Sequence, residues 1–76
     1  MMPEPNWDRI YALALRAEAI HGSGAMDRDT WRQLLAEASG AANGRPDLTS
    51  FLAPYAKGEW IRELRAEEES QARSAA

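Results

Sequence analysis

Residues 26–38, MDRDTWRQLLAEA, decide the fold class of this chain. Asp27 is a good N-cap residue, Asp29 adds a favourable negative charge to a first helical turn, and Met26 with Trp31 has the spacing of a hydrophobic staple. The apolar residues then recur with the helical spacing i, i+3, i+4 and i+7, at Trp31, Leu34, Leu35 and Ala38. This stretch predicts an amphipathic helix, which we expect to end at Gly40 or Gly44.

A second helix is predicted upstream, over residues 7–21. Asn6 is a suitable N-cap, and Gly22 is typical of the position just after a helix. Its apolar arc is wider than the ~100° stripe of an ordinary surface helix. One part of the arc comprises Ile10, Leu13, Ala14, Ala17 and Ile20. The other comprises Trp7, Tyr11 and Leu15, where Glu18 interrupts it. We therefore expect this helix to contact two neighbours, within the chain or outside it.

Downstream, residues 43–46, NGRP, predict a turn. We expect a short helix around Pro46–Ala53, capped by Asp47 and limited by Pro54. The last helix is predicted to start near Gly58 or Glu59, and its apolar pattern stops at Leu64.

The composition agrees with an all-helical chain. Alanine occurs 15 times, valine never, and only five residues are β-branched. The best helix former is thus abundant while strand formers are scarce. The predicted fold is all-α, a small bundle of three principal helices with a short additional helix before the last one.

A chain of 76 residues is far below the size at which hydrophobic cores divide, so one domain is expected. The helical bundle should cover residues 6–66, between a disordered or extended N-terminus over residues 1–5 and a charged, frayed C-terminal tail over residues 67–76. With no cysteine and one histidine, neither a disulfide nor a Cys/His metal centre can reinforce it. The expected core is Ile10, Leu13, Ile20, Trp31, Leu34, Leu35, Phe51, Leu52, Trp60, Ile61 and Leu64.

The net charge of −3 disfavours a general attraction to nucleic acid or anionic lipid. The first residues lack the basic and apolar regions of a signal peptide, and no apolar run approaches the ~18 residues of a membrane span. We expect a cytoplasmic protein.

Catalytic and metal-binding patterns are weak. His21 stands at a helix C-terminus, where histidine is favoured for structural reasons, and no serine lies in a nucleophile motif. Asp27 and Asp29 lack the remaining ligands of a calcium loop. The acidic run of residues 67–69 points its side chains in different directions on a helix. We expect no enzymatic activity, metal, cofactor or small-molecule substrate.

The leading hypothesis is a small non-enzymatic protein–protein interaction module: an adaptor, inhibitor or accessory factor of the kind that phages and mobile elements also encode. Its expected binding residues are Trp7, Tyr11, Leu15 and Glu18, because exposed aromatic side chains are typical of interface hot spots. The partner would be another protein or a second copy of the chain. The charged end of the last helix is either solvated or becomes ordered against a basic partner.

The alternative is a DNA-binding accessory or regulatory protein with a helix-turn-helix-like pair, using Arg28 and Arg32 at the start of the second helix. Asp27 and Asp29 at the same helix end would repel phosphates, and the interhelical connection is longer than the usual 3–4 residues. The acidic total also weakens the electrostatic attraction on which DNA binding depends.

Overall fold

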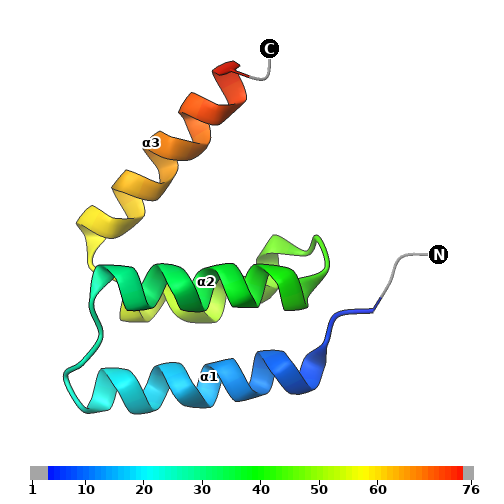
Figure 1. Cartoon of the computed structure of the whole chain (residues 1–76), viewed down its shortest axis with the longest axis vertical. Helices are drawn as coiled ribbons and strands as arrows, with labels where there is room; N and C mark the ends of the chain where they lie inside the picture. The colour runs from blue at the N-terminus through cyan, green and yellow to red at the C-terminus, as the bar shows by residue number, and fades with distance from the viewer. Residues whose placement is uncertain (1–3, 75–76) are drawn as a thin grey trace.

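A computed structural model describes residues 4–74 of the chain. It contains α1 (Trp7–Gly22), α2 (Arg28–Ala42), the 3-10 helix η1 (Pro46–Tyr55) and α3 (Gly58–Ser74). These residues form no strand, and the predicted all-α bundle with a short helix before the last one is confirmed. In Figure 1, α1 and α2 lie side by side and antiparallel, η1 runs behind α2, and α3 leaves them at an angle.

The predicted N-caps of α1 and α2 are both present. The Asn6 side-chain oxygen accepts a hydrogen bond from the Arg9 backbone N–H at 3.1 Å, and the Asp27 carboxylate accepts one from the Thr30 N–H at 2.7 Å. The bonds from Thr30 also lower the pKa of Asp27. Met26 is half-buried against the core, as a staple residue should be. These caps fix where α1 and α2 begin.

The end of α2 differs from the prediction, because Gly40 lies inside the helix and Ala42 is its last residue. Asn43 takes the left-handed C-cap conformation, with φ 51°, and Gly44 follows with φ 86°. Asparagine is one of the few residues with a side chain that adopts this conformation readily. Asn43 therefore ends the helix one residue before Gly44, the later of the two glycines at which the helix was expected to end.

The short helix η1 also differs in detail. It begins at Pro46 with Arg45 at the N-cap, so Asp47 is not its cap; the Asp47 carboxylate lies 3.5 Å from the Arg45 guanidinium. Pro54 lies inside the helix instead of ending it. The Ala56 N–H donates to the Ala53 carbonyl at 3.1 Å, so the last turn closes around Pro54 without using its missing N–H.

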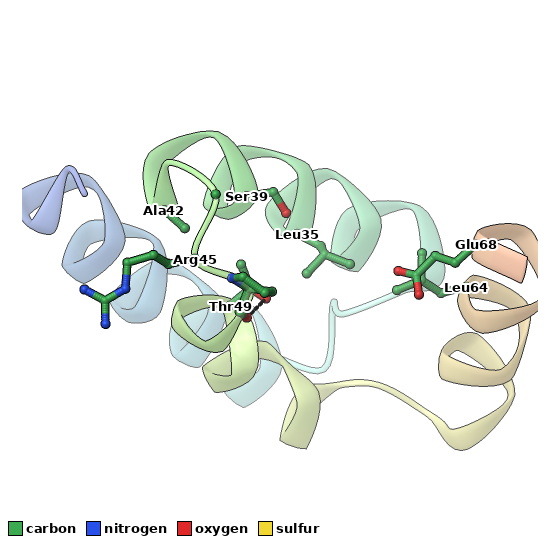
Figure 2. Close-up of a pocket in the computed structure, with 9 residues that line it drawn as sticks. Leu35, Ser39, Ala42, Arg45, Thr49, Leu64 and Glu68 are labelled. Atoms are coloured by element: carbon green, nitrogen blue, oxygen red, sulfur yellow. Dashed lines mark hydrogen bonds between the residues drawn. The ribbon is translucent and has the colours of Figure 1, made fainter. Parts of the chain in front are cut away.

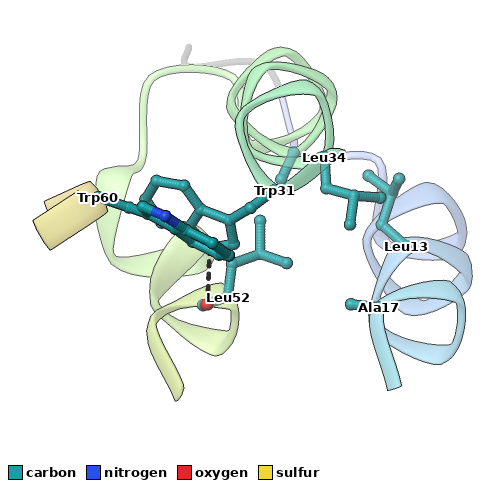
Figure 3. Packing of buried hydrophobic residues seen from close by; sticks show 7 residues of the cluster. Leu13, Ala17, Trp31, Leu34, Leu52 and Trp60 are labelled. Atoms are coloured by element: carbon teal, nitrogen blue, oxygen red, sulfur yellow. Dashed lines mark hydrogen bonds between the residues drawn. The ribbon is translucent and has the colours of Figure 1, made fainter. Parts of the chain in front are cut away.

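The core lies where α1, α2, η1 and the start of α3 meet (Figure 3). Trp31 and Trp60 pack with ring centroids 6.1 Å apart, and the indole N–H of Trp31 donates to the Leu52 carbonyl at 2.9 Å. Leu35, Phe51, Ile20, Ile61 and Leu64 border this cluster and are only partly buried. Four alanines are missing from the expected core but are buried: Ala17, Ala38, Ala41 and Ala42.

The first described residues contact the end of α2, and α3 reaches the last of the described residues. The Asn6 N–H donates to the Ala41 carbonyl at 2.8 Å, and the Asn43 side chain donates to the Glu4 carbonyl at 2.5 Å, so residues 4–6 lie against the end of α2. Helix α3 continues to Ser74, through most of the predicted frayed tail, and residues 65–73 are exposed. Residues 1–3 and 75–76 lie outside the described part. The Cα atoms extend over 42 × 36 × 15 Å.

Candidate interaction surface on helix α1

Helix α1 forms one edge of the molecule (Figure 1). Its apolar residues lie on two sides of the helix. Ile10, Leu13 and Ala17 are buried. Trp7, Tyr11 and Leu15 follow each other at intervals of four residues, so they form a row on another side of the helix. Their exposed fractions are 52%, 68% and 51%, which makes them the large apolar side chains that the described structure leaves exposed.

The carboxylates of α1 lie beside this row. At about 100° per residue, Glu18 falls between Trp7 and Tyr11 around the helix, and Asp8 falls next to Leu15. Both acidic residues are exposed. We call these five residues, Trp7, Asp8, Tyr11, Leu15 and Glu18, the α1 face. It includes all four residues expected to bind a partner. Asp8 was not among the predicted binding residues, although its spacing of three residues from Tyr11 and seven from Leu15 places it on this side of the helix.

The arginines of α1 occupy the opposite side of the helix and bind α2. The Arg9 guanidinium lies 2.8 Å from one carboxylate oxygen of Glu37, and the Arg16 guanidinium lies 4.0 Å from the other. Both arginines of α1 therefore lie near Glu37, on the side of the helix away from the α1 face.

Arg28 and Arg32, the expected DNA contacts, connect α2 to α3. Arg28 lies 3.5 Å from the Glu63 carboxylate, and Arg32 donates to both carboxylate oxygens of Glu67, one of them at 3.2 Å. The hydrogen bonds to Glu67 raise the pKa of Arg32, and the same bonds lower the pKa of Glu67. Sequence analysis missed this pairing because the partners are 35 residues apart.

A shallow groove lies between α2, the start of η1 and α3 (Figure 2). One cavity of the groove has a volume of about 280 Å³, with Leu35, Leu64 and Thr49 among its lining residues. Arg45 and Glu68 also line it, and an adjoining cavity of about 290 Å³ shares Leu35, Leu64 and Glu68. The hydroxyl of Thr49 donates to the Pro46 carbonyl at 2.8 Å, within η1.

Residues 4–74 contain no group of three or more His, Cys, Asp or Glu side chains placed to hold a metal ion. His21 packs its ring against Tyr55, with centroids 5.1 Å apart. Within the same range, no helix has the length and apolar character needed to cross a membrane.

Comparisons of the chain with models of protein families, with curated proteins and with solved structures find no match. The α1 face therefore has to be interpreted from its own geometry and charge.

Proposed function

We propose that the protein is a small, non-enzymatic interaction module that binds another protein through the α1 face. The observation that carries this proposal is the exposed row of Trp7, Tyr11 and Leu15. The other aromatic side chains, by contrast, are buried or half-buried, except for the ring of His21. Trp and Tyr are enriched among the residues that dominate binding energy at protein interfaces.

The support beneath the α1 face favours binding without refolding. Helix α1 is capped by Asn6, packs through Ile10 and Leu13, and is tied to α2 by the Arg9–Glu37 ion pair. A partner would meet a helix whose backbone is already in place, which reduces the entropy lost on association. An adaptor, inhibitor or accessory factor, including one encoded by a phage or mobile element, needs only such a surface and no catalytic group.

Single substitutions test this proposal. Trp7→Ala and Tyr11→Ala should each weaken partner binding by about tenfold or more, because truncated hot-spot residues cost 2 kcal/mol or more. The same substitutions should change the free energy of unfolding by about 0.5 kcal/mol or less, as is usual for exposed side chains. Quantitative pull-down from an extract of the source organism, alongside urea denaturation, measures both quantities.

Arg65→Ala, on the exposed part of α3, is the matched control and should leave capture unchanged. If Trp7→Ala and Tyr11→Ala destabilise the monomer strongly and do not alter capture, the α1 face is a structural surface and the proposal is lost.

DNA binding through Arg28 and Arg32 stays a prediction that no geometric observation favours. Phosphates would have to compete with Glu63 and Glu67 for the two guanidinium groups. The carboxylate of Asp29 lies 3.6 Å from Arg28 and adds to this competition.

A further inference from the structure

The charge on the α1 face has one sign. Around the helix, the charged side chain between Trp7 and Leu15 is the carboxylate of Glu18. The charged side chain directly next to Leu15 is the carboxylate of Asp8. Neither forms an ion pair within the described residues, whereas Arg9 and Arg16 are directed to Glu37 on α2. At about 1.5 Å per residue, Asp8 and Glu18 lie about 15 Å apart along the helix axis. The apolar row is thus bordered by two carboxylates at different positions along the helix axis.

A second copy of the chain is a poor occupant of this face. In a two-fold antiparallel pairing of α1 helices, a residue of one copy lies opposite a residue of the other copy, and the sum of the two residue numbers is the same for every opposed pair. Packing Tyr11 on Leu15 places Asp8 opposite Glu18, and symmetry repeats this contact. Packing Tyr11 on Tyr11 leaves Glu18 beyond Trp7, the first residue of the opposing helix. In any two-fold pairing the α1 face meets an identical face, so four carboxylates and no cationic side chain of these faces come together, which is unfavourable.

A basic partner meets the same features favourably. A row with spacing i, i+4, i+8 fits into an apolar groove, as helices do in helix-in-groove complexes. Lys or Arg residues at two points along the groove border would pair with Asp8 and Glu18 and speed association. Resting on the function proposed above, we infer that the α1 face binds a different protein, one with an apolar groove bordered by Lys and Arg.

Site-specific photo-crosslinking tests this inference on the intact chain. Ala19 is exposed and follows Leu15 by one helical turn, so Ala19→p-benzoylphenylalanine places a crosslinker beside the α1 face without replacing any of its five residues. Irradiation in an extract of the source organism, followed by sequencing of the crosslinked peptide, identifies the partner and the contacted segment. We expect an apolar segment with Lys or Arg within it.

Charge variants of the crosslinking protein give the decisive comparison. The double variant Asp8→Asn with Glu18→Gln should reduce the crosslinking yield about fivefold at low salt, and by much less at about 0.5 M salt, where exposed charges are screened. The matched control, Glu59→Gln with Glu69→Gln, removes two exposed carboxylates of α3 and should leave the yield unchanged.

The outcomes separate this inference from the proposed function. If crosslinking to the partner is lost with Tyr11→Ala but changes neither with the Asp8/Glu18 double variant nor with salt, the partner is not recognised by its basic residues. That result overturns the inference and leaves the proposed function intact. A crosslink between two copies of the chain also overturns the inference. If the Ala19 probe gives no more crosslinking than the same probe at Arg65, the proposed function itself fails.

Discussion

Two tryptophans near the starts of their helices have opposite environments. Trp31 is buried, with an exposed fraction of 3%, whereas Trp7 is 52% exposed. Trp31 lies on α2, which packs against both α1 and η1, so its indole reaches the core and the Leu52 carbonyl. Trp7 lies on α1, which forms one edge of the molecule, in the row of side chains that stays exposed. Position in the bundle, and not residue type, decides which of the two is available to a partner.

The hydrogen bond of Trp31 leads to the first prediction at this scale. Trp31→Phe keeps an aromatic ring but leaves the buried Leu52 carbonyl without the indole donor. We expect a loss of about 1–3 kcal/mol in the free energy of unfolding, the usual range for a buried polar group deprived of its partner. Urea denaturation measures it. Trp7→Phe is the control and should stay within about 0.5 kcal/mol of the parent; equal losses would contradict the burial difference.

The buried alanines lead to the second prediction at this scale. Ala38 is fully buried within the core cluster that α1 and α2 share. Ala38→Leu would force extra carbons into this packed space, and overpacking typically costs about 1–3 kcal/mol. Ala12→Leu, on the exposed side of α1, should leave the thermal midpoint nearly unchanged. A stabilised Ala38→Leu protein would show that the helices can separate without cost.

At the scale of elements, local chemistry predicted the starts of α1 and α2 and the end of α1, but not the N-cap of η1 or the ends of α2 and η1. Asn6 and Asp27 act within three residues of themselves, so their capping could be inferred from sequence. Gly40 and Pro54 failed as helix terminators. Glycine is only a weak helix breaker inside a helix, and the closure of the last turn around Pro54 depends on a 3-10 geometry that the sequence did not reveal.

The candidate surfaces were predictable to different degrees. The spacing of Trp7, Tyr11 and Leu15 placed them on one side of a helix, but only the packed structure shows that this side is exposed. The pairing of Arg32 with Glu67 was beyond prediction, because it depends on the angle at which α3 leaves the bundle.

That pairing yields a prediction about α3. Glu67→Gln removes the charge that holds Arg32, and no apolar side chain beyond Leu64 fixes the rest of the helix. Amide hydrogen exchange of residues 65–73 should become several-fold faster, while the core amides of α2 keep their protection. Glu69→Gln, which changes another exposed carboxylate of α3, is the control. Unchanged exchange in the Glu67 variant would mean that α3 holds its own conformation.

At the scale of the whole molecule, two carboxylates make stability sensitive to acid. Hydrogen bonds from Thr30 lower the pKa of Asp27, and hydrogen bonds from Arg32 lower the pKa of Glu67. Each group therefore binds protons more weakly in the folded state than in the unfolded state. Its contribution is complete above the unfolded pKa, about 4 for such carboxylates, and is lost as the pH falls through the folded pKa.

We therefore expect the urea midpoint to be level between about pH 7 and pH 5 and to fall below about pH 4. The Glu67→Gln variant lacks one of the two groups and should show a smaller fall over the same range. A midpoint that is constant down to pH 3, or an identical fall in parent and variant, would show that the Arg32–Glu67 pair contributes nothing to the acid response.

The flat shape has a thermodynamic consequence. The molecule measures only 15 Å in its shortest Cα extent and exposes 5563 Å², whereas a folded monomer of this mass exposes about 4,600 Å². Unfolding therefore uncovers less new apolar surface than its length suggests, and its heat-capacity change should lie below the roughly 0.9–1.1 kcal/mol/K of an average chain of this size. The curve of stability against temperature is then broad and shallow, so cooling weakens this fold less than it weakens a rounder one.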